Sequence, residues 1–578
     1  MRQLLLSLLP IQALAFGLPA INLLLNGFVV GHYLGASALA AVGFIAPLSS
    51  LSSMLNSMLS NGSQIRSGQD LGRGDREGMA KIFNSTIAFA LAAGLFLTLI
   101  LMTFNRGIVS LMGASAELTE ITRAYLLGMA PSILFGVLFS VMLSFMQLER
   151  AEKESGAAVI VLVAVNTVLN FLNVYVLHWG LFGAGLSTSL ANFIAVAVSL
   201  PYFLRKSPSF RFSLRKIDFM TLKSVLYIGM PSAILPACGI VRDRILNYFV
   251  FTLGGTPAMA AMTVAHNITT AVGWTLEGGY SGSANLITSV LVGERDIESL
   301  RALPKTMVTA MFPIYGAAYA LIFLFARPLA LLFGAETEYI GLYALAIRCS
   351  NLWFLTNTLK TPTLAIYRAL GRIGLVNAFQ MLTLLVLSPL AMASGMLFGL
   401  PVVYNADWIA EALLIIVFSI YYTIRRGRLP DSIFKLTDIP DTLAVPSADR
   451  FSATIRNVAD AMQASGGITD FCKRKGLPPR TAMLYGLCVE ELAVDTLFHG
   501  FSRDKKGMYS IELRAICENG EVTLMLRDNC PHFDPNEWLA IHADPDDERS
   551  LGIRLAAKSA KEMNYTSALG MNVVTIRI

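Results

Sequence analysis

Long apolar runs follow one another along the chain as far as Tyr422, separated by short polar loops. A membrane-spanning helix needs about 20 mostly apolar residues, and twelve runs of that kind can be placed. They begin near Leu4, Ala38, Ile82, Ile121, Ala157, Leu181, Leu222, Met259, Thr306, Ile340, Gly374 and Asp407. The pattern therefore predicts a polytopic α-helical membrane body with twelve transmembrane helices.

Three stretches of sequence recur in the same order farther along the chain. The offset is about 220 residues each time, far longer than the period of a solenoid repeat. The pairs are 31–47 with 252–267, 71–77 (LGRGDRE) with 291–298 (LVGERDIE), and 104–118 with 325–339. Three ordered matches at one offset predict a duplicated unit of six spans. Because six is even, the two repeats are expected to run parallel across the membrane.

Lysine and arginine concentrate in alternate loops between the apolar runs. The basic loops are 66–81, 150–153, 205–223, 295–305, 368–372 and 425–428. The other loops offer little beyond Arg106 and Arg327. Positive charge stays on the cytoplasmic side of a membrane, so both termini are expected in the cytoplasm.

Composition divides the chain into a membrane body and a soluble tail. Of 578 residues, 54% are hydrophobic and 15% are charged, against roughly 25% charged in soluble domains. The charges are sparse before Tyr422 and dense after Arg425. We expect six-helix lobes at 1–212 and 213–428, a linker at 429–445 and a soluble domain at 446–578.

The net charge and the cysteines bear on whether the protein binds nucleic acid or a metal. A net charge of +6 sits mostly in short loops, so no nucleic-acid partner is predicted. The six cysteines show neither a CxxC pair nor metal-ligand spacing. Four of them lie in the tail, which indicates free thiols in a reducing compartment.

The tail shows the pattern of an α+β domain. Its expected elements are helices at 451–475 (interrupted near Gly466), 480–501 and 551–563, strands at 508–517, 521–528 and 572–578, and an irregular acidic segment at 531–549. The first two strands form a hairpin across Glu518-Asn519-Gly520, a strong turn signal. About 130 residues suffice for one hydrophobic core.

Ionisable side chains within the apolar runs are few, and all lie in the second half. They are Arg242, Asp243, Arg244, His266, Glu277, Arg348 and Lys360. An ionisable group at mid-bilayer costs a few kcal/mol, which favours function over packing for Glu277 and Lys360. Asp243 fits a structural or a functional role equally, because its arginine neighbours can neutralise it. An ion pair of Lys360 with Glu277 or with Asp243 is a hypothesis.

The membrane part resembles a known transporter family. The stretches GHYLGASALAAVG, LGRGDREGMAK and NTVLNFLNVYVLHWGLFGAGLSTSLAN are similar to the MATE family of multidrug and toxin extrusion transporters. The resemblance covers about residues 1–425. It implies two six-helix lobes and an antiporter that exports xenobiotic organic cations, driven by protons or sodium.

The chain departs from this family where the first lobe usually carries carboxylates. The matching positions are Asn26, Asn166 and Asn170. An amide neither titrates near neutrality nor carries charge, so the usual proton switch cannot operate there. Amide oxygens could still hold sodium, with weaker attraction. Coupling is therefore expected in the second lobe or in another form, and an interhelical amide network is the alternative for these residues.

The tail resembles the GHKL ATP-binding fold, in its anti-sigma-factor kinase branch. The resemblance is based on the stretches VEELAVDTLFHGF, RDNCPHFDP and ERSLGIRLAAKSAKEM. The resemblance assigns Glu491 as the base if the kinase is active, Asp495 as the Mg²⁺ ligand if ATP binds, and Asp528 as the residue that reads adenine. A carboxylate at 495 replaces the family's asparagine and can still ligate Mg²⁺.

The glycines of this resemblance are only partly kept. Gly552 and Gly570 match family glycines, whereas Cys530, His532 and Ser550 replace others. Glycines let the backbone approach the nucleotide, so a fold that binds ATP poorly is favoured. Whether the tail is an ATP-dependent Ser/Thr kinase stays open.

Three functions are consistent with these features. The first is an antiporter in a bacterial inner membrane that exports a lipophilic or cationic compound, with a degenerate nucleotide-binding regulatory tail. The second is a membrane-anchored anti-sigma-type kinase or partner-switching sensor that uses the membrane body as receptor. The third is a lipid-linked flippase. The expected partners are a small-molecule substrate, membrane lipid and a cytoplasmic regulatory protein.

Overall fold

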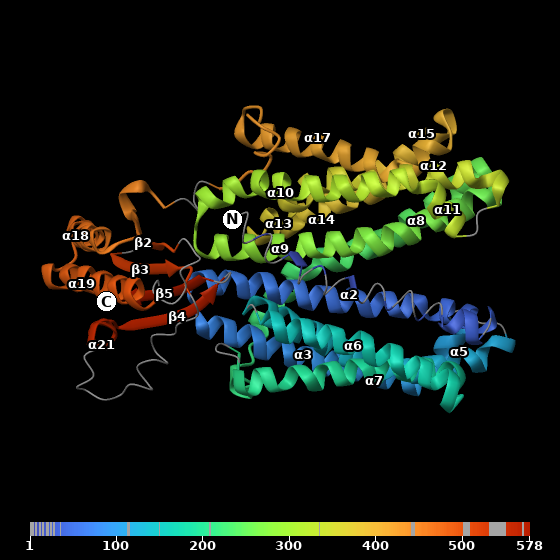
Figure 1. Cartoon of the computed structure of the whole chain (residues 1–578), viewed down its shortest axis with the longest axis horizontal. Coiled ribbons are helices and arrows are strands. Elements are labelled where there is room, and N and C mark those ends of the chain that lie inside the picture. The colour runs from blue at the N-terminus through green and yellow to red at the C-terminus, as the bar shows by residue number, and fades with distance from the viewer. Residues whose placement is uncertain are drawn as a thin grey trace. The chain divides into compact units, whose positions relative to one another are not determined.

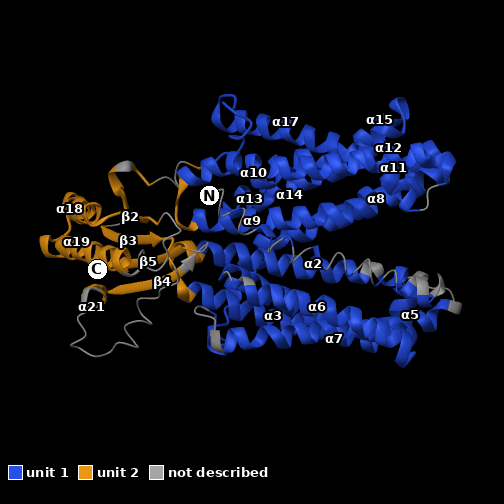
Figure 2. Cartoon of the chain, viewed as in Figure 1, with its two compact units in different colours: residues 1–69, 78–292, 298–439 blue, residues 70–77, 293–297, 440–578 orange. Residues whose placement is uncertain are grey.

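The computed structural model describes residues 5, 9–10, 13, 17–18, 22, 26, 29–34, 36–111, 116–149, 151–206, 210–333, 336–440, 445–500, 509–518, 520–530, 551–568 and 571–578 (Figure 1). It divides into two compact units, coloured separately in Figure 2. Unit 1 comprises residues 1–69, 78–292 and 298–439, and unit 2 comprises residues 70–77, 293–297 and 440–578.

All regular elements of unit 1 among its described residues are helices. In the first half the elements are η1 (Val30–Leu34), α2 (Ala36–Arg73), α3 (Arg76–Thr103), α4 (Asn105–Leu111), α5 (Ala116–Leu148), α6 (Glu152–Leu172), η2 (Asn173–Leu177), α7 (Gly180–Pro201), η3 (Tyr202–Lys206) and η4 (Leu214–Lys216).

The second half repeats this design. Its elements are α8 (Phe219–Ile268), η5 (Thr269–Gly273), α9 (Trp274–Gly293), α10 (Ile297–Leu324), α11 (Ala326–Leu332), η6 (Thr337–Tyr339), α12 (Ile340–Ser350), α13 (Trp353–Ala369), α14 (Ile373–Leu382), η7 (Thr383–Leu387), α15 (Ser388–Phe398), α16 (Leu400–Tyr404) and α17 (Ala406–Arg426).

The described helices confirm the predicted membrane body. Eight helical segments of the described residues are long and apolar enough to cross a membrane. Eleven of the twelve predicted runs begin inside a described helix, and the first, near Leu4, lies largely outside the described residues. The segment 219–293 covers two predicted runs. It is broken at Gly255, whose φ of +60° departs from helical geometry just before Pro257.

Close helix contacts in unit 1 depend on small residues. A Cβ at Gly185 of α7 would lie 2.6 Å from the carbonyl oxygen of Tyr125 in α5. A Cβ at Gly62 of α2 would likewise clash with the backbone of α8 at Val225. Without a hydrophobic driving force between helices in lipid, such backbone approach supplies the packing energy.

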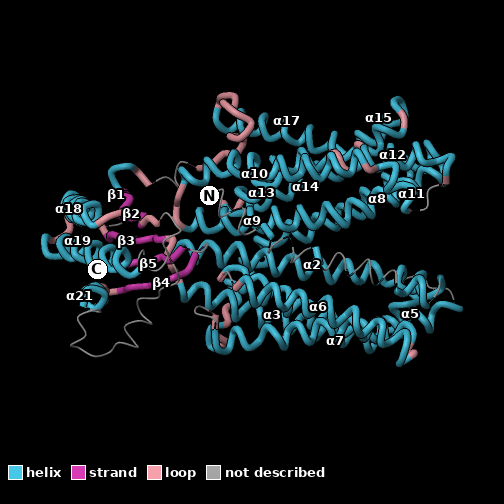
Figure 3. Tube along the Cα trace, viewed as in Figure 1, coloured by secondary structure: helices cyan, strands magenta, loops and turns pink. Residues whose placement is uncertain are grey.

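Unit 2 is an α+β domain built on one five-stranded antiparallel sheet (Figure 3). The strand order is β1-β2-β3-β5-β4. The strands are β1 (Arg450–Ile455), β2 (Ile511–Glu518), β3 (Glu521–Asp528), β4 (Glu562–Ala568) and β5 (Met571–Arg577), and the helices are α18 (Val458–Arg474), α19 (Pro479–Asp495) and α21 (Leu551–Ser559).

One face of this sheet forms the hydrophobic core of unit 2 with the helices. Leu513, Leu524 and Ile576 project from the strands and are fully buried. They belong to one cluster with Phe471 of α18 and Val489 of α19. Alternate residues of each strand point to this side, as the period of two requires. The predicted α+β domain with a single core is confirmed.

The opposite face of the sheet is covered by the two short loop segments of unit 2. In the segment 293–297, Glu294 accepts from the Arg527 Nη1 of β3 at 2.7 Å. Asp296 lies 2.8 Å from the Arg514 Nη1 of β2. In the segment 70–77, the carbonyl oxygen of Gly74 accepts from the side chain of β4 at Asn564. The paired loops of the sequence duplication thus share one sheet face.

Two elements of the tail differ from the prediction. The predicted hairpin is confirmed, with Glu518 paired to Glu521 and Gly520 at φ +83°, whereas Asn519 lies outside the described residues. The helix predicted at 451–475 is wrong at its start, because residues 450–455 form β1. The helix begins only at Val458, where the Asn457 side chain caps it by accepting from Asp460 N.

The second difference lies near the C-terminus. The helix predicted to reach residue 563 ends at Ser559, and β4 follows it. The helix α18 also continues through Gly466 without the predicted interruption. Both missed strands lie at the edges of the sheet. Edge strands pair on one side only, so their sequences show a weak alternation of apolar and polar residues.

Candidate functional site

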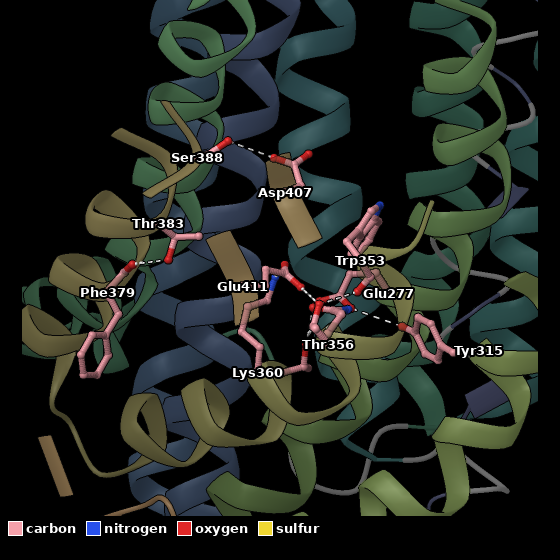
Figure 4. Close-up of polar contacts among 12 residues, drawn as sticks. Glu277, Tyr315, Trp353, Thr356, Lys360, Phe379, Thr383, Ser388, Asp407 and Glu411 are labelled. Atoms are coloured by element: carbon pink, nitrogen blue, oxygen red, sulfur yellow. Dashed lines mark hydrogen bonds and ion pairs between the residues drawn. The ribbon is translucent and has the colours of Figure 1, made fainter. Parts of the chain in front are cut away.

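One turn of α13, residues 356–361, joins two carboxylates of the second half (Figure 4). We call these residues the α13 turn. Two of its polar side chains bond Glu277 of α9, and two others bond Glu411 of α17. The helical spacing explains this arrangement, because positions three and four apart share a face while their neighbours face away.

Glu277 is surrounded by uncharged hydrogen-bond donors. The Thr361 Oγ1 donates to Glu277 Oε1 at 3.2 Å, and the amide of Asn357 donates to Oε2. The Tyr315 hydroxyl of α10 donates to the same oxygen at 3.3 Å. A π-helical turn, η5, lies directly before α9, and such turns are frequent at functional sites. Among the described residues, no cation bonds this carboxyl group directly.

Glu411 forms an ion pair with Lys360. The Glu411 side chain is 8% exposed, and that of Lys360 is 22% exposed. The second Glu411 oxygen accepts from the Thr356 Oγ1 at 2.7 Å. The Lys360 Nζ lies 5.9 Å from the centre of the Trp353 ring, within range of a cation–π interaction. The ammonium therefore has a carboxylate and an aromatic face as partners.

A second ion pair joins α8 to α17. Arg242 bonds Asp407 through two nitrogens, one of them at 3.1 Å from Oδ1. Ser388 donates to the same Oδ1 at 3.2 Å. Arg242 also contacts Asp243, whose side chain is 50% exposed. A bidentate pair of this kind locks two helices together, so the role of Arg242 is to hold α8 against α17.

These contacts identify the ion-pair partner of Lys360, which the sequence left open. Lys360 takes neither Glu277 nor Asp243 as its ion-pair partner, but Glu411. Sequence reasoning missed Glu411 and Asp407, which lie in the last apolar run. Both residues could have been found by the criterion that selected Glu277, namely an ionisable residue inside an apolar helix. Their partners could not be read from spacing, because they lie on different helices.

The remaining charged candidates of the second half lie apart from this cluster. Arg348 donates to the carbonyl oxygen of Phe323 at 3.1 Å and covers the ring of that residue. His266 is exposed on α8. Neither bonds the α13 turn, so we assign them no part in its chemistry.

In the first half the three asparagines form one chain of hydrogen bonds. The Asn170 amide donates to Asn26 Oδ1 at 2.8 Å and to Asn166 Oδ1 at 2.9 Å. The Asn166 amide donates in turn to Thr188 Oγ1 at 3.2 Å. Asn166 and Asn170 are buried. Since each amide satisfies the next, the arrangement matches the interhelical network given as the alternative.

The tail places its sequence-predicted residues at one end of the sheet and on α19. Glu491 and Asp495 lie one turn apart on α19, and Asp528 ends β3. Burial raises the pKa of the Asp528 carboxyl above its usual value, although hydrogen bonds oppose this effect. Gly552 lies in the first turn of α21. Gly570 lies outside the described residues, as do His532 and Ser550.

The described residues fit the family's nucleotide only in part. Asp528 Oδ1 already accepts from Asn572 Nδ2 at 2.8 Å and from Cys530 N at 2.9 Å. A Cβ at Gly500 would lie 2.9 Å from the Cys530 Sγ, so the thiol packs tightly against that glycine. No group of three or more His, Cys, Asp or Glu within the described residues could hold a metal ion. The carboxylate that the resemblance assigns to adenine is therefore already bonded within the chain, and no chemistry is assigned to ATP.

Two family models match the chain. The model described as MatE matches residues 16–176 and 231–397, which together exceed half of the chain. The model described as a histidine kinase-like ATPase domain matches residues 451–578. The two MatE segments correspond to the two halves that the sequence duplication predicts.

Curated relatives include multidrug transporters of bacteria. The probable multidrug resistance protein NorM of Photorhabdus laumondii is 26% identical over 263 residues, which cover 44% of this chain and 56% of that protein. The multidrug export protein MepA of Staphylococcus saprophyticus is 21% identical over 408 residues, which cover 70% of this chain and 90% of that protein.

Solved structures share the fold of the membrane body. A MOP superfamily transporter from Pyrococcus furiosus, with a binding pocket of reverse polarity, matches with a TM-score of 0.68 at 22% identity. A multidrug resistance MATE family transporter in an outward-facing conformation matches with a TM-score of 0.69 at 22% identity. Each match covers 74% of this chain and 96% of the other.

The apolar helices and these similarities together make the protein a multi-pass membrane protein. The predicted MATE-type body with an ATPase-like tail is confirmed. The chain belongs to the MatE family of transporters, and a histidine kinase-like ATPase domain follows its two MatE repeats.

Proposed function

We propose that the protein is a secondary active antiporter that exports a lipophilic, cationic compound in exchange for protons or sodium. The observation that carries this proposal is the α13 turn, which holds Glu277 and Glu411 on two neighbouring helices. Carboxylates inside a helical bundle bind cations, and they are rare in membrane spans unless they serve transport.

The first half supports the same assignment, because its side chains at the family's carboxylate positions carry no titratable group. Asn26, Asn166 and Asn170 satisfy one another with hydrogen bonds, and none of them can release a proton. A proton-driven cycle must therefore use the carboxylates of the second half. The proposal gives Asp243 no part in coupling, since it contacts Arg242 and its side chain is half exposed.

Transport by the full-length protein in liposomes tests the proposal. We expect ethidium to accumulate inside the liposomes against its own gradient when an outward gradient of protons or sodium is imposed. The variants Glu277→Gln and Glu411→Gln should each lose this movement, and Asp243→Asn serves as the exposed control. Movement of a fluorescent phospholipid in place of ethidium would contradict antiport and support the flippase alternative.

We propose that the tail regulates transport from the cytoplasmic side of a bacterial plasma membrane, with both termini in the cytoplasm. The positive charges of the alternate loops support this orientation. The tail would respond to a partner protein or to weakly bound nucleotide. A C-terminal fusion to green fluorescent protein should fluoresce in cells, and a fusion to alkaline phosphatase should be inactive. The opposite result would reverse the topology.

The kinase alternative has its own readout. The full-length protein, incubated with labelled ATP, Mg²⁺ and a cell extract, should transfer no phosphate to serine or threonine. Glu491→Gln is the matched control for background labelling. Label that appears with the wild-type protein and disappears with this variant would make the tail an active kinase.

A further inference from the structure

The ammonium group of Lys360 occupies a site suited to an organic cation. It bonds the Glu411 carboxylate, whose orientation is fixed by Thr356. The face of Trp353 lies 5.9 Å away. A buried carboxylate beside an aromatic face is the combination that recognises organic ammonium ions. In this structure the ammonium ion at that site is the side-chain group of Lys360.

A second carboxylate lies beside the same turn. Thr361, the residue after Lys360, donates to Glu277 at 3.2 Å, and Asn357 lies one turn before and bonds the same group. Lys360 thus lies on the same turn of α13 as both residues that bond Glu277. The lysine stem is long and flexible, with a compact charge at its end. Its ammonium can therefore exchange one carboxylate for the other by rotation of the side chain.

We propose that Lys360 is a tethered counter-ion that holds the place of the exported cation and leaves it when that cation binds. This inference rests on the proposed antiport. In this proposal Glu277 is a neutral carboxyl group while Lys360 bonds Glu411. The incoming cation bonds Glu411 and covers Trp353, and Lys360 moves to Glu277. An ammonium beside Glu277 favours its ionised form, so the carboxyl O–H bond breaks heterolytically. The electron pair stays on the carboxylate oxygen, and the proton passes to water.

The charge in the cluster is then conserved in each exchange. One monovalent cation enters and one proton leaves, while Lys360 neutralises whichever carboxylate has no other partner. The cation and the proton therefore exclude each other, which is the condition for antiport. The titratable groups near Glu277 among the described residues also include Tyr315, whose hydroxyl donates to it, and Tyr280, whose hydroxyl donates to the carbonyl oxygen of Thr358. Arg368 lies two turns farther along α13.

Proton release on cation binding tests this exchange directly. Purified full-length protein in weakly buffered detergent, mixed with tetraphenylphosphonium, should release close to one proton per bound cation. Glu277→Gln should bind the cation and release none. Lys360→Ala should bind it with little proton release, because no ammonium is displaced toward Glu277. Release from Lys360→Ala equal to that of the wild type would overturn the proposal.

Chemical rescue tests the site that the lysine would vacate. Lys360→Ala should gain thermal stability on addition of ethylammonium chloride, whereas the wild type and the double variant Lys360→Ala/Glu411→Gln should not. Equal shifts in all three proteins would refute the tethered counter-ion. If Lys360→Ala fails to fold, Lys360→Arg keeps the charge. The arginine side chain should bond Glu411 through two nitrogens, so tetraphenylphosphonium should bind about tenfold more weakly. Unchanged binding would refute the proposal.

The outcome is separable from that of the proposed function. If the wild type moves ethidium under an ion gradient but Lys360→Ala releases protons normally, antiport stands and the tethered counter-ion fails. If the wild type shows no gradient-driven movement at all, the antiport itself fails.

Discussion

At the scale of single residues, Cys530 lies beside Asp528, the residue that the family resemblance assigns to reading adenine. It replaces a glycine of the family pattern, and its Sγ packs against Gly500. Replacing it with glycine removes the thiol from the side of Asp528 and restores space for the nucleotide base.

The change Cys530→Gly should therefore raise the affinity of the full-length protein for trinitrophenyl-ATP by about tenfold, equivalent to about 1.4 kcal/mol. Fluorescence titration in the presence of Mg²⁺ measures this effect. Cys517→Ala removes a thiol of β2 that does not contact Asp528, and it should leave the affinity unchanged. Equal affinities for all three proteins would show that the thiol does not limit binding.

Gly183 is a second residue whose role is steric. A Cβ there would clash with Asn173 Oδ1. That oxygen accepts from Trp179 N at 3.1 Å, while the Asn173 amide donates to the carbonyl oxygen of Gly180 at 2.9 Å. These bonds close the connection between α6 and α7.

Gly183→Ala should lower the free energy of unfolding by about 1–3 kcal/mol, through overpacking and the loss of these hydrogen bonds. Thermal unfolding of the detergent-purified protein reports the change. The control Gly156→Ala lies on α6 with nothing near its Cβ position, and it should be neutral or slightly stabilising. Similar melting temperatures for both variants would refute the steric argument.

At the scale of elements, the segment after α17 anchors the C-terminal end of α13. Asp438 is buried and pairs with Arg372 at 2.9 Å and with Arg426 at 2.7 Å. Its backbone N–H donates to the Tyr367 hydroxyl of α13 at 3.2 Å. The helix that holds the α13 turn is thus tied to Asp438, in the middle of the linker predicted at 429–445.

Burial alone would raise the pKa of Asp438, but the neighbouring arginines outweigh it and lower the pKa below its usual value. The stabilisation is therefore complete above the ordinary carboxyl pKa, near ~3.9, and is lost as the pH falls through the lowered folded-state pKa. Asp438→Asn should cost about 1–3 kcal/mol at pH 7.

The difference in melting temperature between wild type and Asp438→Asn should shrink when the pH is lowered toward 3. Lys435→Gln, which removes an exposed pair with Asp431, is the control and should show little effect at either pH. A wild-type advantage that grows with acidity would have the wrong sign for a lowered pKa.

The sequence predicts elements best where the apolar pattern is long. Eleven apolar runs and the 511–528 hairpin are clear because many residues or a defined turn report them. The edge strands β1 and β4 escape prediction, since short strands paired on one side leave a weak pattern. The residues around the α13 turn likewise divide into those that the sequence predicts and those that it does not. Glu277 and Lys360 stand out as ionisable residues in apolar helices, but the Glu411 partner of Lys360 depends on how α13 and α17 pack.

At the scale of the whole molecule, the two repeats have diverged in charge. The first half carries an amide chain from Asn26 to Asn166, and the second carries the carboxylates on either side of the α13 turn. In the proposed mechanism, one lobe of the duplicated fold is fixed by uncharged hydrogen bonds, and the other exchanges cations. On this account, coupling belongs to the second repeat alone.

The most direct test of this central claim separates coupling from substrate movement. Full-length wild type and Glu277→Gln are reconstituted in liposomes, and ethidium movement is measured both as counterflow and under an imposed proton gradient. We predict that Glu277→Gln retains counterflow but loses the uphill transport that the gradient drives in the wild type. Uphill transport by Glu277→Gln at the wild-type rate would contradict the account.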